Sequence, residues 1–115
     1  MSTLHVTVDA DQASLAEVIE TAARSGLLVI LTARMFRELA RELGSNDAAM
    51  RHLLAVSIKA NRPIGCNFPT ANGSRTAFIA PSTWTQERLR GWVGARHQEI
   101  AAMFGPVTPG PLEDL

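Results

Sequence analysis

A glycine between two stretches of helical apolar spacing restricts the fold more than any other feature of this chain. Apolar side chains recur on one helical face before Gly44, at Phe36, Leu39, Ala40 and Leu43, and again after it, at Met50, Leu53 and Leu54. Glycine ends helices readily because it adopts positive φ without steric cost. Ser45 or Asn46 then offers a side-chain oxygen that caps a following helix. The stretch therefore predicts two helices joined by a tight turn, over about 33–43 and 47–60.

Two strands and a helix are predicted before this pair. Residues 3–8 alternate apolar and polar side chains, which is typical of a half-buried strand. The segment 14–17 reads Ser-Leu-Ala-Glu, the form of a capping box, and a helical apolar spacing follows it until Ser25-Gly26. Residues 27–31 form a short apolar run with two β-branched members, which favours a buried strand, and Thr32 is suited to cap the next helix.

A hairpin and a final helix are predicted after the pair. Pro63 ends the preceding helix, because proline disfavours helical geometry in the residue before it. Asn72-Gly73 lies between two strand-like runs, 64–68 and 75–80, and predicts a tight hairpin turn. An apolar stripe then predicts one long helix from about 84 to 104. The Pro- and Gly-rich tail 105–115 cannot continue it, so residues 1–104 are expected to form a single domain.

Charge gives the chain no overall attraction to a polyanion. Eleven Lys and Arg residues balance eleven Asp and Glu residues, which counts against nucleic-acid binding without excluding it. In the helix predicted over 33–43, three arginines alternate with two glutamates, at Arg34, Arg37, Glu38, Arg41 and Glu42. Pairing within that helix would neutralise much of its positive stripe.

Chain length and cysteine usage indicate an ordinary soluble domain. A chain of 115 residues buries roughly two-thirds of the surface of its unfolded form, so its core requires no metal or disulfide. The single Cys66 forms no intramolecular bridge and no zinc cluster. Apolar runs fall far short of the roughly 20 residues that span a bilayer, and the N-terminus has no signal-peptide pattern. We expect a cytoplasmic protein that does not associate with a membrane.

The order of the elements after the first strand resembles the winged helix-turn-helix domains of bacterial and phage DNA-binding proteins. The resemblance covers about residues 15–79 and is closest over 32–54 and at Arg62-Pro63-Ile64-Gly65. That family has a small residue within the first helix of the motif, a glycine four residues later and an aliphatic residue six beyond, which correspond to Ala40, Gly44 and Met50. Ser45 stands where the family usually has an apolar residue, which suggests a different turn or cap.

The resemblance implies a fold class and a general function. The expected fold is α+β, mainly helical, with three to four helices, a small antiparallel sheet, an extra N-terminal strand and a long C-terminal helix. The expected function is binding of double-stranded DNA, as a small transcriptional regulator or a phage or plasmid accessory factor. The helix over 84–104 is longer than a minimal winged helix requires, so its apolar stripe suggests a homodimer interface.

If the helix over 47–60 enters a major groove, its outward side chains near the N-terminus face the bases. These residues are Asn46, Asp47, Ala48, Arg51 and His52. Arg51 has the donors for bidentate contact with guanine, and Asp47 would have to accept from a cytosine amino group. Three further residues are candidates for phosphate contacts, namely Lys59, Arg62 and Arg75. The alternative for each is an ordinary solvated surface, with Asn46 or Asp47 serving only as a cap.

No arrangement of residues indicates an enzyme. His5, His52 and His97 lie on different predicted elements, without the spacing of a metal site, and Cys66 has no histidine near it in sequence. We therefore expect no catalytic residue, metal or cofactor. The alternative function is a winged-helix module that binds or inhibits another protein without binding DNA, which the balanced charge and Asp47 favour.

Overall fold

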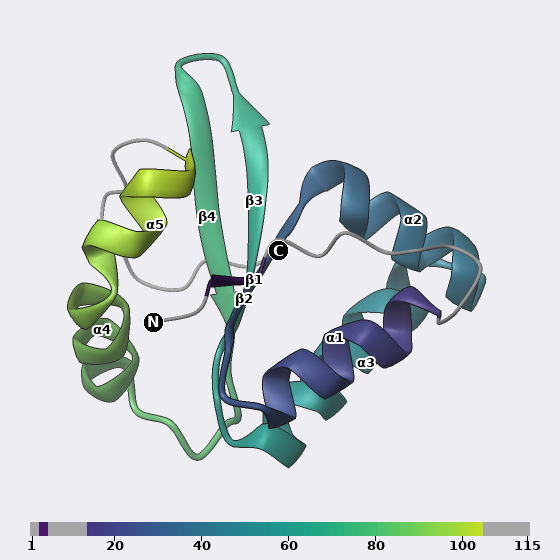
Figure 1. The fold of residues 1–115 in the computed structure, drawn as a ribbon, viewed down its shortest axis with the longest axis horizontal. Coiled ribbons are helices and arrows are strands. Elements are labelled where there is room, and N and C mark those ends of the chain that lie inside the picture. Colours follow the sequence, from purple (N-terminus) through teal and green to yellow (C-terminus); the bar gives the residue numbers. More distant parts are fainter. Residues whose placement is uncertain (1–2, 5–13, 105–115) are drawn as a thin grey trace.

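A sheet lies between two layers of helices (Figure 1) in this computed structural model, which describes residues 3–4 and 14–104. In chain order the elements are β1 (Thr3–Leu4), α1 (Leu15–Arg24), β2 (Leu28–Thr32), α2 (Ala33–Leu43), α3 (Asn46–Ala60), β3 (Ile64–Thr70), β4 (Gly73–Ile79), α4 (Gln86–Ala95) and α5 (His97–Phe104). Helices α1, α2 and α3 cover one face of the sheet, and α4 and α5 cover the other. The predicted α+β class is confirmed.

The sheet is mixed, with the strand order β1-β2-β3-β4. β2 pairs in parallel with both β1 and β3, in a register that sets Ile30 opposite Gly65, whereas β3 and β4 are antiparallel. The sequence predicted a small antiparallel sheet, and this prediction is wrong for β2, which pairs in parallel. Helices α2 and α3 form the crossover that a parallel pair of strands requires, and they return the chain to the end of the sheet where β2 began.

β2 is buried from both sides, which explains its unbroken apolar run. Val29 and Leu31 face the core shared with α1, α2 and α3, while Leu28 and Ile30 face the core shared with α4 and α5. Strands covered by helices on both faces lose the alternation of apolar and polar residues seen in half-exposed strands. The prediction of a buried strand over 27–31 is confirmed, with bounds shifted by one residue.

Side-chain caps fix the predicted helix bounds. The Thr32 hydroxyl accepts a hydrogen bond from the amide of Met35, and α2 ends at Gly44, whose φ of 105° lies in the left-handed region. The Ser45 hydroxyl then accepts from the amide of Ala48 at 3.0 Å. The different cap that Ser45 suggested is thus an ordinary N-cap, and α3 begins directly after it.

Glu42 joins the end of α2 to the start of α1. Its Oε1 accepts a hydrogen bond from the amide of Leu15 at 2.8 Å, and its Oε2 accepts from the amide of Ala16 at 2.9 Å. Amides in the first turn of a helix have no partner within the helix and favour a negative charge. Glu38 pairs with Arg41 on α2 as expected, at 3.1 Å. Glu42 instead hydrogen-bonds to α1 and does not pair with an arginine of α2.

The predicted long helix over 84–104 is two helices. It breaks at Arg96, whose φ of −110° and ψ of 12° lie outside helical geometry. Gly91 and Gly94 weaken the preceding turns, and the break lets both α4 and α5 pack on the same face of the sheet. The apolar stripe is buried there within one chain, at Leu89, Val93 and Ile100. The ground for a dimer through 84–104 is thereby removed.

The hairpin turn differs from its prediction by one residue. Thr70 pairs with Gly73, so Ala71 and Asn72 form the turn. Gly73 has a φ of 135°, while Asn61 is the only residue other than glycine with positive φ in the described ranges.

Two predictions at the chain ends fall largely outside the description. Of the predicted strand 3–8, Thr3 and Leu4 form β1, and residues 5–8 lie outside the described residues, as does the predicted tail 105–115. In the described ranges, no helix combines the length and the apolar character needed to span a bilayer.

Candidate nucleic-acid interface

The first half of α3 presents only part of the predicted DNA-contacting set. Asn46, Asp47 and Arg51 are exposed, whereas Ala48 is half-buried. The His52 ring is also half-buried, and its Nε2 lies 3.2 Å from the carbonyl oxygen of Ala16 on α1. His52 therefore faces the neighbouring helix instead of solvent, because its position on α3 lies beside the α1 contact.

The three predicted phosphate contacts lie in different places. Lys59 is exposed, but its Nζ lies 3.3 Å from Glu20 Oε1 on α1, and this hydrogen bond lowers the pKa of the Glu20 carboxyl. Arg62 is half-buried beyond the end of α3, and Arg75 is exposed on β4. In the β3–β4 register Arg75 stands opposite Phe68, whose ring packs against Phe36 of α2, so Arg75 lies on the face of the sheet that carries α1, α2 and α3. The eight predicted residues therefore do not form one surface.

The exposed face of α3 carries two large apolar side chains. Leu54 is 41% exposed and Ile58 is 56% exposed, one helical turn apart. The sequence assignment of Leu54 to a buried stripe was wrong. The buried line of α3 instead runs through Leu53, Val56 and Ser57, because the Ser57 hydroxyl donates to backbone carbonyl oxygens and so satisfies its polarity in the core.

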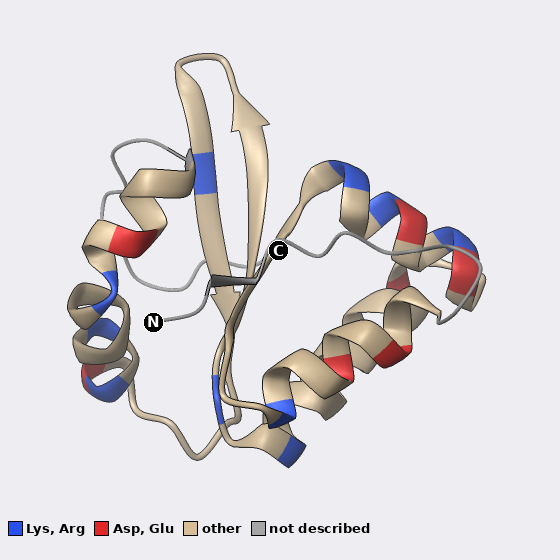
Figure 2. Cartoon of the chain, viewed as in Figure 1, with Lys and Arg blue, Asp and Glu red and all other residues tan. Residues whose placement is uncertain are grey.

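Positive charge is in excess in the part of the chain that follows α3. All eleven basic residues lie within 14–104, but only seven of the eleven acidic residues do. Residues 14–60 hold six basic and five acidic residues, whereas residues 61–104 hold five basic and two acidic. The whole chain therefore has zero net charge but a local positive excess in 61–104. Figure 2 shows that basic and acidic residues are mixed along α1 and α2. We call the three arginines carried by α4 and its C-cap the arginine face: Arg88, Arg90 and Arg96.

Each of the two tryptophans holds one of these arginines. The Arg88 guanidinium carbon lies 3.8 Å from the centre of the Trp84 ring system, and that of Arg96 lies 4.1 Å from the centre of Trp92. The two indoles meet edge to face, with centroids 6.4 Å apart. Arg96 Nη1 also donates to the carbonyl oxygen of Trp92 at 3.0 Å. Stacking on indole holds a guanidinium by cation–π attraction and leaves N–H groups at its edge available to an acceptor.

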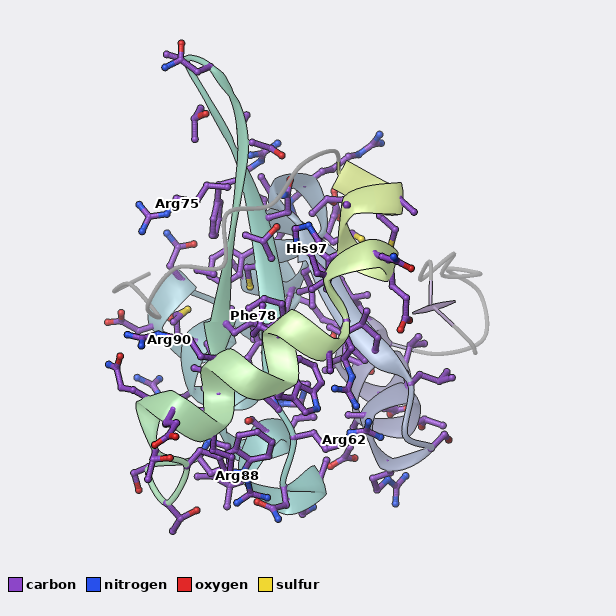
Figure 3. All side chains as sticks on the ribbon, turned by 90° about the vertical axis from the view of Figure 1, so that its left-hand side faces the viewer. Arg62, Arg75, Phe78, Arg88, Arg90 and His97 are labelled. Atoms are coloured by element: carbon purple, nitrogen blue, oxygen red, sulfur yellow. The ribbon has the colours of Figure 1, made fainter. Side chains whose placement is uncertain are left out.

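The end of α3 is tied to the same cluster. Trp84 Nε1 donates to Asn61 Oδ1 at 2.9 Å, and Asn61 ends α3 with a left-handed φ of 53°. The next residue, Arg62, lies so close to the turn after α1 that a Cβ on Gly26 would be 2.8 Å from its Nη1. In Figure 3, Arg62, Arg88 and Arg90 lie near α4, whereas Arg75 lies on the hairpin, away from it.

Side-chain hydrogen bonds between β3 and β4 hold the hairpin that carries Arg75. Asn67 on β3 is buried, and its side-chain amide donates to Thr76 Oγ1 at 2.8 Å and to Ser74 Oγ at 3.2 Å. These bonds cross from β3 to the two neighbours of Arg75, so the strand that presents this arginine is held in register. Beyond them the hairpin extends past the helices (Figure 1).

Sequence reasoning missed the pairing of tryptophan with arginine, although the spacing holds a signal for it. Trp84 precedes Arg88 by four residues, and Trp92 precedes Arg96 by the same interval. Side chains four residues apart meet on one face of a helix, so each interval predicts an aromatic–guanidinium contact.

Neither a metal-ligand group nor a reactive thiol is found among the described residues. Within them, no group of three or more His, Cys, Asp and Glu side chains is placed to hold a metal ion. Burial raises the pKa of the Cys66 thiol to about 12, which keeps it protonated and unreactive at neutral pH. Comparison of the chain with models of known protein families, with curated protein sequences and with solved structures finds no significant match.

Proposed function

We propose that this protein binds double-stranded DNA through the arginine face, with phosphate contacts supplying most of the affinity. The observation that carries the proposal is the excess of five basic over two acidic residues in 61–104. Phosphate neutralisation by arginine releases condensed counterions, and this sequence-independent contribution dominates many protein–DNA affinities. A local excess of charge is sufficient for it, so the zero net charge of the whole chain does not oppose binding.

The geometry of the arginines supports this role. Arg88 and Arg96 are held on indole rings, which reduces the conformational freedom lost when a guanidinium binds a phosphate. Arg75 lies on the projecting hairpin, which corresponds to the wing in the winged helix-turn-helix resemblance. In that finer hypothesis α3 would read bases through Asn46 and Arg51, and the hairpin would contact the backbone.

Binding of a fluorescein-labelled random-sequence duplex, followed by anisotropy at several salt concentrations, tests the proposal. Arg88→Gln/Arg90→Gln should weaken binding at least tenfold and reduce the salt slope by about 1.8, at about 0.9 for each lost phosphate contact. Arg34→Gln/Arg37→Gln removes the same charge from exposed positions of α2 and is the matched control. Equal weakening by both pairs, or no binding of duplex at low salt, would overturn the proposal.

A third variant separates the arginine face from the predicted recognition helix. Arg51→Ala should change affinity less than Arg88→Gln/Arg90→Gln on random-sequence DNA. If Arg51→Ala instead costs about 1–3 kcal/mol on one preferred sequence, α3 reads bases as the resemblance implies.

A second candidate function is protein association through α3, which the exposure of Leu54 and Ile58 favours. Large apolar side chains one turn apart on a free helix face are typical of a helix that packs on another protein surface. Sedimentation equilibrium tests the simplest case, a second copy of this chain. Association that Leu54→Gln/Ile58→Gln abolishes would support it, and a monomer at all concentrations would refute that case.

A further inference from the structure

The direction of the Arg88 side chain depends on one aromatic ring. Its guanidinium carbon lies 3.8 Å from the centre of the Trp84 ring system. Neither of the two ion pairs found among the described residues includes Arg88. Arg88 also stands in the first turn of α4, where the partial charge of the helix end is positive and disfavours a cation. The stacking on Trp84 is therefore the contact that holds this guanidinium in place.

The ring of Trp84 is supported on two sides. It meets the Trp92 ring edge to face, with centroids 6.4 Å apart. Its Nε1 donates a hydrogen bond to Asn61 Oδ1 at 2.9 Å. The aromatic contact restrains the ring within α4, whereas the hydrogen bond fixes its N–H edge to the end of α3. The plane on which Arg88 lies thus depends on a side chain from another helix.

The backbone on both sides of this hydrogen bond is anchored by one buried hydroxyl. Ser57 Oγ is hydrogen-bonded to the carbonyl oxygen of Arg62, the residue after Asn61, at 2.6 Å. It also lies 3.3 Å from the carbonyl oxygen of Ile79, which precedes the loop that carries Trp84. Asn61 itself has a left-handed φ of 53°, which asparagine adopts more readily than most residues. The fold therefore brings the acceptor and the donor together.

We propose that Asn61 is a positioning residue for DNA binding, which acts on Arg88 through Trp84. A guanidinium already held in its binding direction loses less conformational freedom when it meets a phosphate. The inference rests on the proposed function, in which the arginine face contacts phosphate. It adds to that function a residue of the α3 end that acts without any contact of its own to the DNA.

Asn61→Gly tests the proposal, because glycine keeps the left-handed φ and removes the side-chain acceptor. In the duplex anisotropy assay it should weaken binding by about twofold to tenfold, the cost of immobilising one freed side chain, and leave the salt slope unchanged. Arg88→Gln removes the charge itself, so it should reduce the slope by about 0.9. An unchanged affinity of Asn61→Gly, or a slope reduced as in Arg88→Gln, would overturn the proposal.

Double variants test whether the effect passes through Trp84. Asn61→Gly should add no loss of affinity in Arg88→Gln, but should keep its full effect in Arg90→Gln, because Arg90 is an exposed arginine of the same helix. Trp84→Phe keeps an aromatic ring without the N–H, so Asn61→Gly should add nothing to it either. Equal weakening by Asn61→Gly in all three backgrounds would indicate a general structural role and contradict the proposal.

Side-chain nitrogen relaxation of the intact protein, measured without DNA, separates this inference from the proposed function. The Nε–H order parameter of Arg88 should exceed that of Arg90 in the wild type and should fall toward it in Asn61→Gly. Such a fall, in a protein that binds no duplex, supports the positioning of Arg88 and refutes the proposed function. Duplex binding together with an unchanged Arg88 order parameter in Asn61→Gly refutes the positioning role alone.

Discussion

Removing the Glu42 carboxylate should destabilise the protein far more than its exposed position suggests. Glu42→Ala deletes two hydrogen bonds of 2.8 and 2.9 Å to first-turn amides of α1. A buried hydrogen bond to a charged group contributes about 1.5–3 kcal/mol, and the helix dipole adds about 0.3–1 kcal/mol. Because water reaches this carboxylate, we expect a combined loss of about 1–2 kcal/mol. Glu42→Gln, which keeps one acceptor oxygen, should lose about half of that.

The same helix provides the control. Glu38 forms an exposed pair with Arg41 three residues later, so Glu38→Ala should cost under about 0.5 kcal/mol. Urea unfolding followed by far-UV circular dichroism measures both free energies, and the melting temperature of Glu42→Ala should fall by roughly 5–10 °C. The reasoning is refuted if Glu42→Ala loses no more stability than Glu38→Ala.

Three further substitutions and the titration of Cys66 test packing and charge. Gly65→Ala should destabilise the protein by about 1–3 kcal/mol in thermal melts, because the added Cβ would lie 2.8 Å from a buried aromatic ring of β4. Gly91→Ala has open space around the added Cβ, so it should stabilise the protein by about 0.5–1 kcal/mol. Cys66 should resist alkylation until urea unfolds the chain. Stability should fall as the pH rises above 9.0, because the unfolded thiol ionises there while the buried thiol keeps its proton to about 12. Lys59→Met should raise the pKa of Glu20 toward its ordinary value in an NMR titration, with little change in stability for so exposed a pair.

Local signals in the sequence were sufficient to place the helical hairpin. The bounds of α2 follow from the Thr32 cap and from Gly44, and both act through hydrogen bonds or φ values within a few residues. The strand directions depend instead on residues far apart, so no local pattern could show that β2 runs parallel to β3. The break at Arg96 likewise depends on the sheet face that α4 and α5 share.

The exposed surface of α3 was predicted less well than the helix bounds, for a related reason. Leu54 was placed on the apolar stripe of α3, but it is exposed, and Ser57 takes a core position because its hydroxyl donates to backbone carbonyl oxygens. With Ser57 in the core, the exposed face of α3 differs from the predicted one, and His52 lies against α1. The local excess of positive charge was hidden because charge was counted over the whole chain, whereas three of the four excess positive charges of 14–104 lie in 61–104.

The parallel contact between β2 and β3 has a consequence for how the chain folds. Ile30 meets Gly65, thirty-five positions later, whereas the turn of the β3–β4 hairpin closes over two residues. Closing a long loop loses entropy before any contact compensates for it. The α2–α3 pair shortens the distance between β2 and β3 only after both helices have formed. We therefore expect the centre of the sheet to assemble last, so that the kinetics of folding depend on helices that lie outside it.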